Sequence, residues 1–428
     1  MAAGKRSETT ALVVGGGFGG LACAKQLSKH GVHVILVDKH DFTQFQPLLY
    51  QVATAQVNVT DVARPIRQAF RKSAGVAFRV ADVTNIDPST KTVISADGVS
   101  MSADYLVLAM GSQPNFFNTP GADTHAFPLY SLDDAERLRS RFLTVWEASL
   151  RNPKLLDQGA LNFVIIGAGA TGVETAGAVA DCLHRVIPHR VRESVTDAAR
   201  IYLVDPAPVV LAPFSDRAHT YARKALEDRH VTLELGLRVT DIAADRVTLS
   251  DGREILTRTV VWAGGIQAAE VAASAGIAQG HGGRFDVAAD LTVPSFTGVY
   301  AVGDVANTLG PNEKPYPQLG SVALQAGRWA ADNILADIDG KPRSDFHYKD
   351  KGIMAMIGRN AAVAEMGSKR RELHGIAAFA AWLGVHAWLL SGFRERFNAL
   401  TTWGWDYVAN TRPSAIIDRP DAAQIDWD

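Results

Sequence analysis

Two glycine-rich stretches carry the residue types and spacing that bind dinucleotides. Their glycines are Gly15, Gly17 and Gly20 in the first stretch and Gly167, Gly169 and Gly172 in the second. In this GxGxxG pattern the first glycine allows a tight turn, the second lets the backbone approach a pyrophosphate, and the third lets a helix pack on a strand. Each stretch follows an apolar, largely β-branched run and precedes a small-residue segment. The sequence therefore predicts two dinucleotide sites, with glycine turns that hold no ligand as the alternative.

An acidic residue at the end of the next strand strengthens this prediction, because its carboxylate can bond a ribose hydroxyl. The strand VHVILVDK places Asp38 there, and the strand RIYLVDP places Asp205 there. Asp205 lies farther from its glycines than the usual spacing of about 20 residues. We therefore expect extra helix and loop between Asp181 and Arg200.

Two further stretches hold candidate ligand contacts. The apolar loop from Phe45 to Tyr50 is able to line a ring-shaped ligand, or it packs in a core. The strand TGVYAVGDVAN places Asp304 beside a helix start, where it either accepts bonds from a ribityl chain or caps the helix.

The length, composition and net charge of the chain limit the functions that it can have. The chain has 428 residues, enough for two to three domains, and 47% of them are hydrophobic. A net charge of -2 argues against a nucleic-acid partner, which needs a clustered basic face. The two cysteines, Cys23 and Cys182, form neither a CxxC pair nor a metal-ligand spacing, so we expect no metal site. The N-terminal residues lack an apolar signal core, so we expect a cytoplasmic catalytic body.

The elements that position these residues occur twice in the same order. The first glycine-rich stretch is followed by a strand that ends in Asp38. Next come a small β excursion, which is a short group of strands outside the main sheet, and a strand that ends at Ala109 and Gly111. A helix capped by Ser131 leads to the second glycine-rich stretch. This stretch is followed by a strand that ends in Asp205, then by a helix, further β strands and the strand 259–265. This repetition predicts an α/β fold with two Rossmann-like dinucleotide-binding domains.

Several motifs together resemble type II NADH dehydrogenase, the single-subunit NADH:quinone oxidoreductase within the two-dinucleotide flavoproteins. They are FQPLLYQVAT (45–54), GATGVETAG (169–177), PQLGSVALQAGRWAADNI (317–334), FHYKDKGIMAMIGRNAAV (346–363) and GFRERFNALTTWGWDYV (392–408). The resemblance covers roughly residues 10–410. It implies a FAD-binding domain at 1–120 and 290–345, an NADH-binding domain at 121–289, and a C-terminal domain at 346–428 with membrane-associating helices.

The resemblance also implies the site residues. Non-covalent FAD would contact Gly15, Gly17, Gly20, Asp38, Val83, Ala109, Gly111, Asp304, Ala323 and Leu324, the last two through the backbone at a helix start. NADH would contact Gly167, Gly169, Gly172, Asp205 and Gly264. A carboxylate at Asp205 favours NADH, because it would repel the 2′-phosphate of NADPH.

Three further residues are expected near the reacting groups. Glu174, expected in the first turn of its helix, would lie near the nicotinamide and flavin, or it is only a helix N-terminal carboxylate. Ser321 and Gln325 would contact a membrane quinone, either ubiquinone or menaquinone. Ser321 departs from the family's pattern, which has a glutamine there, so the quinone and its contact stay open.

The C-terminal segment is expected to lie on a lipid bilayer surface. The stretch 374–393 is mostly apolar, and Phe393, Phe397, Leu400 and Tyr407 recur at helical spacing, with Trp403 and Trp405 for the headgroup zone. Lys369, Arg370 and Arg371 precede it. The alternative is a soluble dimer interface.

We therefore expect a homodimeric, non-proton-pumping enzyme that is peripheral on the cytoplasmic side of the cell membrane. The rival functions are a sulfide:quinone oxidoreductase, a soluble NADH-dependent flavoprotein reductase and a non-catalytic NADH-sensing module.

Overall fold

The computed structural model describes residues 2–71, 73, 75–186, 195–390, 392–412 and 414–427. The chain divides into two compact units. Unit 1 comprises Met1–Thr43, Arg64–Gln113 and Ile266–Lys349. Unit 2 comprises Gln44–Ala63, Pro114–Gly265 and Asp350–Asp428. Two short ribbons, β3 (Phe42–Gln44) with β4 (Ala63–Pro65) and β10 (Ser112–Pro114) with β19 (Ile266–Ala268), stand where the chain passes between the units.

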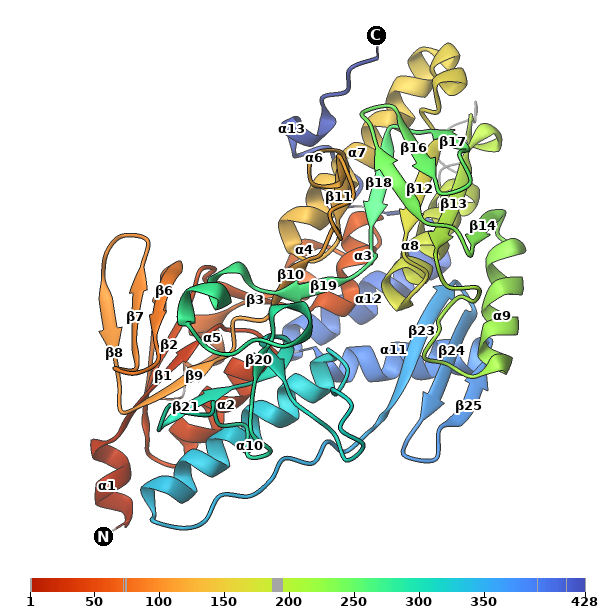
Figure 1. The fold of residues 1–428 in the computed structure, drawn as a ribbon. Helices are drawn as coiled ribbons and strands as arrows, with labels where there is room; N and C mark the ends of the chain where they lie inside the picture. Colours follow the sequence, from red (N-terminus) through yellow and green to blue (C-terminus); the bar gives the residue numbers. More distant parts are fainter. Residues whose placement is uncertain are drawn as a thin grey trace. The chain divides into compact units, whose positions relative to one another are not determined.

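Unit 1 is built on a parallel sheet of five strands. Their order is β21 (Val299–Ala301), β9 (Tyr105–Leu108), β1 (Thr10–Val14), β2 (His33–Asp38) and β5 (Val76–Val80). Helices α2 (Phe18–Lys29) and α10 (Gly320–Ile338) lie side by side in this unit (Figure 1). Val13 is buried with residues of these helices, whereas its neighbours Leu12 and Val14 belong to a second core cluster. Burial of both sheet faces explains why these strands are continuous apolar runs.

The remaining elements of unit 1 are short. They are α1 (Ala2–Glu8), α5 (Ile66–Ala69), an antiparallel sheet of β6 (Val83–Asp87), β7 (Thr92–Ser95) and β8 (Ser100–Ser102), the 3-10 turns η6 (Glu270–Ala275), η7 (His281–Gly283) and η8 (Gly303–Val305), and the pair β20 (Phe285–Asp286) and β22 (Ala306–Asn307). The sheet β6-β7-β8 is the predicted β excursion. The helix α1 was not predicted.

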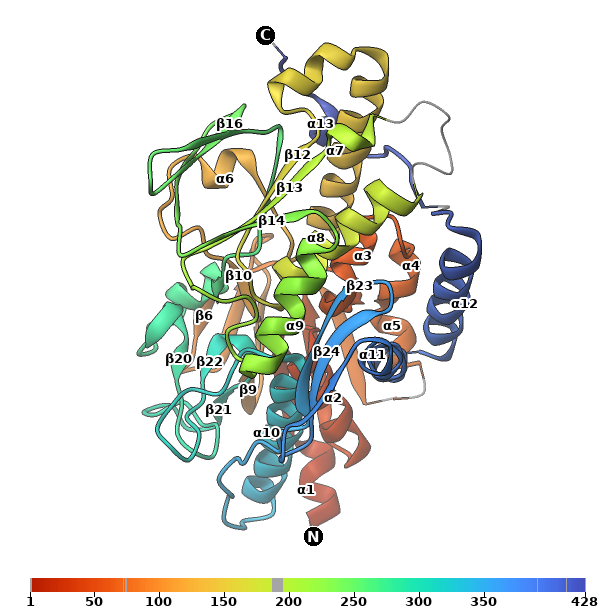
Figure 2. The same ribbon diagram turned by 90° about the vertical axis from the view of Figure 1, so that its right-hand side faces the viewer.

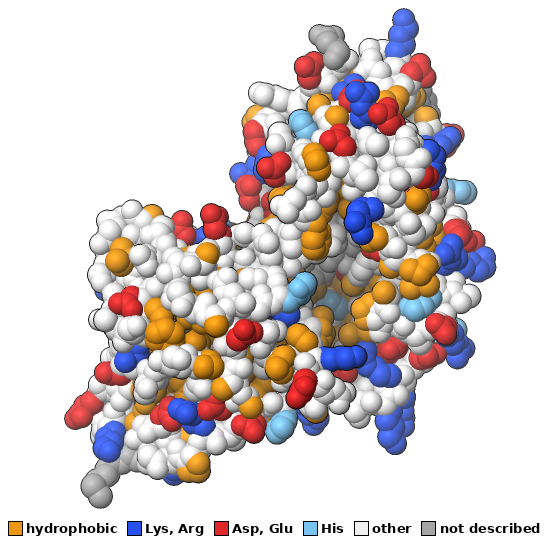
Figure 3. Space-filling view, in the orientation of Figure 1, with side chains coloured by type: hydrophobic (Ala, Val, Ile, Leu, Met, Phe, Trp, Pro, Cys, Tyr) orange, Lys and Arg blue, Asp and Glu red, His pale blue; other side chains and the backbone are white. Residues whose placement is uncertain are grey.

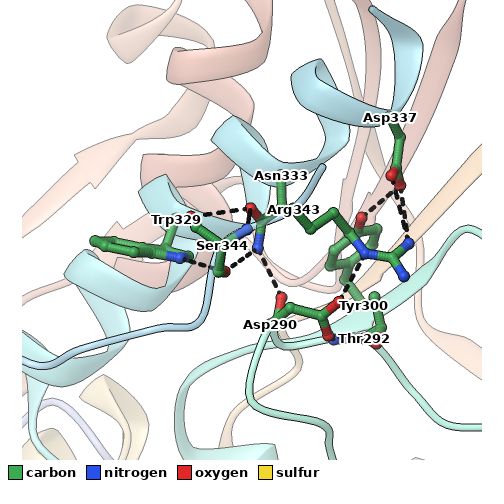
Figure 4. Close-up of polar contacts among 8 residues, drawn as sticks. All are labelled: Asp290, Thr292, Tyr300, Trp329, Asn333, Asp337, Arg343 and Ser344. Atoms are coloured by element: carbon green, nitrogen blue, oxygen red, sulfur yellow. Dashed lines mark hydrogen bonds and ion pairs between the residues drawn. The ribbon is translucent and has the colours of Figure 1, made fainter. Parts of the chain in front are cut away.

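A polar network fixes the C-terminal half of α10 within unit 1 (Figure 4). Arg343 Nε donates to Asp290 Oδ2 at 2.6 Å, and Tyr300 Oη donates to Asp337 Oδ2 at 2.7 Å. Trp329 Nε1 donates to the carbonyl oxygen of Ser344 at 2.9 Å. These bonds tie the segment after α10 to the helix and to Asp290, and they tie the helix to β21.

Unit 2 repeats the design of unit 1. Its parallel sheet has the order β11 (Ala126–Pro128), β18 (Thr259–Trp262), β12 (Asn162–Ile166), β13 (Arg200–Asp205) and β14 (Val231–Leu235). Its helices include α6 (Ala122–His125), α7 (Leu132–Arg151), α8 (Ala170–Asp181) and α9 (Asp216–Glu227), and β15 (Val239–Ile242), β16 (Arg246–Leu249) and β17 (Glu254–Leu256) form an antiparallel sheet. Ser131 caps α7 with a capping box, as predicted.

The C-terminal elements also belong to unit 2. The antiparallel strands β23 (Gly352–Gly358), β24 (Ala361–Met366) and β25 (Arg371–His374) are followed by α11 (Ile376–Leu389), α12 (Phe393–Ala409) and α13 (Pro420–Ala423). Helix α8 packs along β23, and α11 packs against β24 (Figure 2). No helix within the described residues is both long and apolar enough to cross a bilayer.

The compact units correct the expected domain boundaries. The segment 350–428 belongs to unit 2 instead of forming a third domain, because β23 packs on α8 and β24 contacts α9. The loop 44–63 also joins unit 2, since its helices α3 (Leu49–Ala53) and α4 (Val59–Val62) contact α7, α8 and α12. Residues 266–289 belong to unit 1. Of the extra segment expected at 181–200, residues 187–194 lie outside the described residues.

The face of the molecule in Figure 3 carries interspersed acidic and basic side chains. This mixture agrees with the near-neutral net charge of the sequence.

Candidate functional site

The two glycine fingerprints fold into matching turns, one in each unit. Gly15 and Gly167 begin them with φ of +106° and +104°, and a Cβ on either would lie 2.2 Å or 2.4 Å from the carbonyl oxygen of Ala109 or Ala263. The third glycine of each turn, Gly20 or Gly172, lies so close to the first that a Cβ would meet its carbonyl oxygen. Both turns therefore require glycine for the reasons that the pattern predicts.

The middle glycines differ from the others in a way that points to a ligand. Gly17 and Gly169 are the N-cap residues of α2 and α8, and a Cβ on either would meet no atom within 4 Å. Open space directly at a helix N-terminus, where the first backbone amides have no partner within the helix itself, is the arrangement that holds a pyrophosphate. Each unit therefore fits a dinucleotide.

The two acidic residues hold these turns in the same manner. Asp38 Oδ2 accepts from the amide of Gly16 at 2.5 Å, and Asp205 Oδ2 accepts from the amide of Ala168 at 2.6 Å. Their Oδ1 atoms accept from the amides two residues onward, at 2.8 Å and 2.7 Å. Each carboxylate thus fixes its turn and keeps a negative charge beside it. Ribose binding by these residues remains a prediction.

In unit 1 the predicted FAD contact Asp304 bonds Ser112, the residue after the predicted contact Gly111, and Gln318. Asp304 Oδ2 accepts from Ser112 Oγ at 3.1 Å, and its carbonyl oxygen accepts from Gln318 Nε2 at 3.0 Å. Burial raises the pKa of this carboxyl above its ordinary value. Ala109 and Gly111 follow β9, where Gly111 takes a positive φ, and Val83 begins β6. Asp304 lies in η8 and caps no α-helix.

The predicted amides at the start of α10 need a correction. The amide of Ala323 already donates to the carbonyl oxygen of Leu319 at 3.0 Å, and Leu324 lies one residue deeper in the helix. The amides that have no partner within a helix are those of its first residues, here Gly320 to Val322. A ligand at this terminus would use them instead.

The predicted quinone ligands Ser321 and Gln325 lie in unit 1 and make other bonds. Ser321 Oγ and Tyr348 Oη are 2.9 Å apart. Gln325 Nε2 donates to the carbonyl oxygen of Lys349 at 3.1 Å, and its Oε1 accepts from the amide of Lys349 at 3.0 Å. Both ends of the Gln325 amide are therefore paired with backbone.

Glu174 is a buried carboxyl in the second turn of α8, one turn later than predicted. It lies too far along the helix to act as an N-terminal carboxylate. Its Oε1 accepts from the amide of Met356 at 3.1 Å and from Trp382 Nε1 at 3.2 Å. Burial raises its pKa to about 8, although both hydrogen bonds act to lower it. At neutral pH the side chain is protonated.

Glu174 lines a cavity of about 460 Å³ within unit 2. Tyr50 and Gln51 of α3, Met356 of β23 and Trp403 of α12 also line it. The remainder includes apolar residues of α11 and α12, among them Ile376, Phe379, Ala380, Leu383, Leu400, Tyr407 and Val408. A volume of this size is typical of a pocket for a small organic ligand.

Four of these lining residues are also large exposed hydrophobic residues, namely Ile376, Leu400, Tyr407 and Val408. The same cavity therefore has a buried carboxyl in its lining and exposed apolar side chains of α11 and α12 elsewhere in it. Such an arrangement suits a ligand that has a reactive head and arrives from an apolar medium.

Buried aromatic side chains surround Glu174. Trp403 Nε1 donates to Gln51 Oε1 at 2.7 Å, and Gln51 Nε2 donates to Tyr50 Oη at 3.1 Å. Burial raises the pKa of Tyr50 well above its ordinary value, so its phenol stays protonated. The sequence placed Tyr50 in a candidate loop but gave no role to Gln51, Met356 or Trp382. The motifs 45–54, 169–177, 346–363 and 392–408 each contain residues of this region, but the sequence did not bring them together.

The structure corrects the expected place of Trp403. Trp403 is buried and bonded to Gln51, so it does not face outward with Trp405, whose side chain is exposed. Trp382 is fully buried, whereas Trp388 on the same helix is 73% exposed. Arg370 pairs with Asp350 at 2.9 Å, which offsets part of the basic charge predicted to face lipid.

Gly177 brings α8 close enough to β23 for the Met356 amide to reach Glu174. A Cβ at this position would lie 2.0 Å from the carbonyl oxygen of Ile357. We expect Gly177→Ala to lower the free energy of unfolding by about 1–3 kcal/mol through overpacking. Gly384→Ala is the control, because a Cβ there meets nothing within 4 Å and the change should be neutral or slightly stabilising. Equal chemical-denaturation midpoints for both variants would contradict this role of Gly177.

No group of three or more His, Cys, Asp or Glu suited to a metal ion occurs in the described part of the chain. Cys23 is buried, and burial raises the pKa of its thiol, so it is a poor nucleophile. Cys182 is buried at the start of the π-helical turn η3 (Cys182–Val186).

Comparisons with known proteins agree with this geometry. Residues 9–327 match the family described as pyridine nucleotide-disulphide oxidoreductase. The type II NADH:quinone oxidoreductases NdhA and Ndh of Mycobacterium tuberculosis are 34% and 32% identical to this chain. Both comparisons cover 95% of this chain, with 88% of NdhA and 89% of Ndh.

A solved structure shares the fold. It is that of NDH2 from Plasmodium falciparum in complex with NADH, which matches with a TM-score of 0.86 at 17% identity. The match covers 95% of this chain and 99% of that chain.

Proposed function

Because the chain belongs to the pyridine nucleotide-disulphide oxidoreductases and, among them, to the type II NADH:quinone oxidoreductases, we propose that it oxidises NADH through FAD and reduces a membrane quinone. FAD, when bound, supplies the chemistry of accepting a hydride and returning two electrons. Every other task falls to the chain's own residues. They bind two dinucleotides, hold the quinone and supply a proton.

Unit 1 would hold FAD and unit 2 would hold NADH. In each unit the pyrophosphate would lie at the N-terminus of α2 or α8, where Gly17 or Gly169 leaves space. Asp304 in unit 1 offers an acceptor for hydroxyl groups of the flavin's ribityl chain. Asp205 in unit 2 places a negative charge at the end of β13, which favours the 2′-hydroxyl of NADH over the 2′-phosphate of NADPH.

The cavity in unit 2 is the observation that supports quinone binding. Its lining joins buried Glu174 and Tyr50 to exposed apolar side chains on α11 and α12. A quinone has a polar ring and a long apolar tail, so this lining matches both parts. Tyr50 and Glu174, in place of Ser321 and Gln325, are the donors that we assign to the quinone ring.

Glu174 would deliver a proton to the quinone. NADH gives up a hydride, while the quinol product carries two electrons and two protons, so one proton enters per turnover from outside the hydride. A carboxyl with a pKa of about 8 is protonated at neutral pH and is able to donate. After donation it would regain a proton from water.

Helices α11 and α12 would rest on a membrane surface. Phe393, Phe397, Leu400 and Val408 recur at helical spacing on α12, and each is at least half exposed. The buried residues of α12, Glu395, Ala399 and Trp403, occupy the other side. An exposed apolar stripe of this kind is typical of a helix that lies in the lipid interface.

The double variant Phe393→Glu with Phe397→Glu tests this surface. Each phenylalanine contributes about 1.5–3 kcal/mol when it is buried, so we expect the liposome dissociation constant to rise about a hundredfold. Val80→Glu is the control, because Val80 is half exposed in unit 1. Liposome flotation measures binding, and unchanged flotation of the double variant would refute the proposal that this face of α12 binds a membrane.

We further propose a homodimer on the cytoplasmic side of the cell membrane. A sulfide:quinone reaction is disfavoured, because it works through cysteines beside the flavin and the thiol of Cys23 is buried with a raised pKa.

An anaerobic titration of the detergent-purified holoenzyme tests the proposed function. We expect NADH to bleach the oxidised-flavin absorbance, NADPH to bleach it much more slowly, and a ubiquinone or menaquinone analogue to restore it. Failure of NADH to bleach bound flavin would refute the dehydrogenase function. Bleaching without recovery by quinone would refute the acceptor.

A further inference from the structure

The indole of Trp382 reaches from α11 to the carboxyl of Glu174 on α8. Trp382 is fully buried, and its Nε1 donates to Glu174 Oε1 at 3.2 Å. The Met356 amide donates to the same oxygen at 3.1 Å. Two N–H donors on Oε1 leave Oε2 as the oxygen that carries the proton in the neutral carboxyl.

The packing around Trp382 holds the indole in this position. His386 stacks on it with ring centroids 3.8 Å apart and an angle of 18° between the planes. His386 Nδ1 donates to the carbonyl oxygen of Trp382 at 2.9 Å, since a carbonyl only accepts. Tyr50 and Trp403 contact the indole at centroid distances of 6.4 Å and 6.0 Å. An indole enclosed on several sides has little freedom to rotate away from Glu174.

We propose that Trp382 is a positioning residue for Glu174, which fixes the carboxyl so that its protonated oxygen is available to the quinone in the cavity. The inference rests on the proposed function of Glu174 as proton donor and adds the side chain that makes it effective. It also gives α11 a second task, because the helix that carries exposed Trp388 and Leu389 holds the reactive carboxyl through its buried residue.

The pH dependence of quinone reduction tests the hydrogen bond from Trp382 Nε1 to Glu174 Oε1. The N–H of Trp382 stabilises the charged form of Glu174, so its loss raises the pKa of the carboxyl and extends activity to higher pH. The other titratable or charged residues that line the cavity are Tyr50, Asp181, Arg185, Arg359, Asp406, Tyr407 and Arg412. His386 on α11 stacks on Trp382.

Two of these groups, Tyr50 and His386, do not change charge near pH 8 and so do not imitate Glu174. The phenol of Tyr50 has a raised pKa, and burial lowers the pKa of His386 to about 4, so both stay neutral. Asp181 accepts from the amide of Arg359 at 2.6 Å. Burial raises the pKa of Asp406, while Arg412 acts to lower it.

The test compares Trp382→Phe with Trp329→Phe in the holoenzyme. Both changes remove one indole N–H donor, but that of Trp329 bonds the carbonyl oxygen of Ser344 in unit 1. For Trp382→Phe we expect turnover with a quinone analogue to fall about tenfold at neutral pH, and the alkaline limb of its pH profile to move up by about one unit. Flavin bleaching by NADH should not change. Trp329→Phe should leave both the turnover and the limb as they are.

Glu174→Gln separates failure of this inference from failure of the proposed function. If it abolishes the alkaline limb while Trp382→Phe leaves the limb in place, Trp382 does not position the carboxyl. If Glu174→Gln keeps the limb, the proton-donor role is wrong and the inference about Trp382 falls with it. Absence of bleaching by NADH in the unmodified protein contradicts the proposed function itself.

A second measurement covers the case in which Trp382→Phe loses flavin or folds poorly. The amino acid 3-benzothienylalanine at position 382 keeps the shape of the two fused rings and lacks only the N–H donor. Infrared difference titration then follows the carbonyl stretch of the protonated carboxyl, identified by its absence in Glu174→Gln. We expect the band to shift in frequency and its midpoint to move to higher pH. An unmoved band and midpoint would overturn the proposal.

Discussion

Glu174→Gln should lower quinone-dependent turnover by about 10² or more, while NADH continues to bleach the flavin at close to the wild-type rate. General acid catalysis typically contributes a factor of about 10²–10⁴, and glutamine offers no acidic proton. In the wild type, turnover should be nearly constant below pH 8 and fall above it, because Glu174 loses its proton through a pKa of about 8. The variant should lack this alkaline limb. Stopped-flow bleaching and steady-state turnover across pH measure the two parts separately.

The stability of the same variant provides an independent check on the buried carboxyl. Its pKa rises from 4.5 in the unfolded chain to about 8 in the folded protein, so the unfolded state binds fewer protons between these values. Wild-type stability therefore falls as the pH rises from about 4.5 to about 8. Glutamine removes this loss, so the variant should gain thermal stability relative to wild type as the pH rises. A difference in melting temperature that is independent of pH would mean that Glu174 is not buried as described.

Gly169→Val should abolish detectable NADH binding and leave FAD in place. The backbone at Gly169 is extended, with φ of -72° and ψ of -173°, and a Cβ meets nothing within 4 Å, so the fold should tolerate valine. The branched side chain would occupy the space at the N-terminus of α8 where the pyrophosphate is proposed to lie. We expect the KM for NADH to rise at least about a hundredfold, the loss of roughly 3 kcal/mol of binding free energy.

Gly17→Val is the matched variant in unit 1, since Gly17 has the same place at the start of α2 and the same open surroundings. It should lose FAD during purification, as measured by the ratio of flavin to protein absorbance. If instead Gly169→Val lost FAD and Gly17→Val lost NADH binding, the assignment of the two units would be reversed. Normal binding of both cofactors by both variants would mean that the two glycine-rich turns do not form the dinucleotide sites.

Local sequence patterns predicted the nucleotide-binding parts of the fold because those parts are made of neighbouring residues. The third glycine of each turn, Gly20 or Gly172, is needed because a Cβ would meet the carbonyl oxygen of the first glycine in the same strand-turn-helix unit. Ser131 and Asp134 form the capping box of α7 within four residues. Repetition of the same order of elements then predicted two similar sheets, which both have parallel strands.

The cavity was not predictable in the same way, because its residues come from distant segments. Tyr50, Glu174, Met356 and Trp403 lie on four elements that only the folded chain brings together. A helical pattern placed Trp403 near lipid, yet its indole turns inward to bond Gln51. Sequence shows that a tryptophan is apolar with one polar atom, but it does not show which neighbour satisfies that atom.

The bonds of Gln325 and the bounds of the compact units also depend on segments that are distant in the sequence. Gln325 was assigned from its place in a motif, and its amide is engaged by the backbone of Lys349. The family resemblance implied a third domain formed by the C-terminal segment 346–428. That segment packs on α8 and completes unit 2.

The order of elements along unit 2 has a consequence for how the protein is made. The parallel sheet from β11 to β18 comes from one continuous stretch, and it is available to fold once that stretch has left the ribosome. The bonds to Glu174 come from Met356 and Trp382, which are synthesised much later. Until they arrive, the carboxyl on α8 has neither of these donors, and the cavity has no lining from α11 and α12. A nascent chain should thus acquire its nucleotide fold first and its quinone chemistry last.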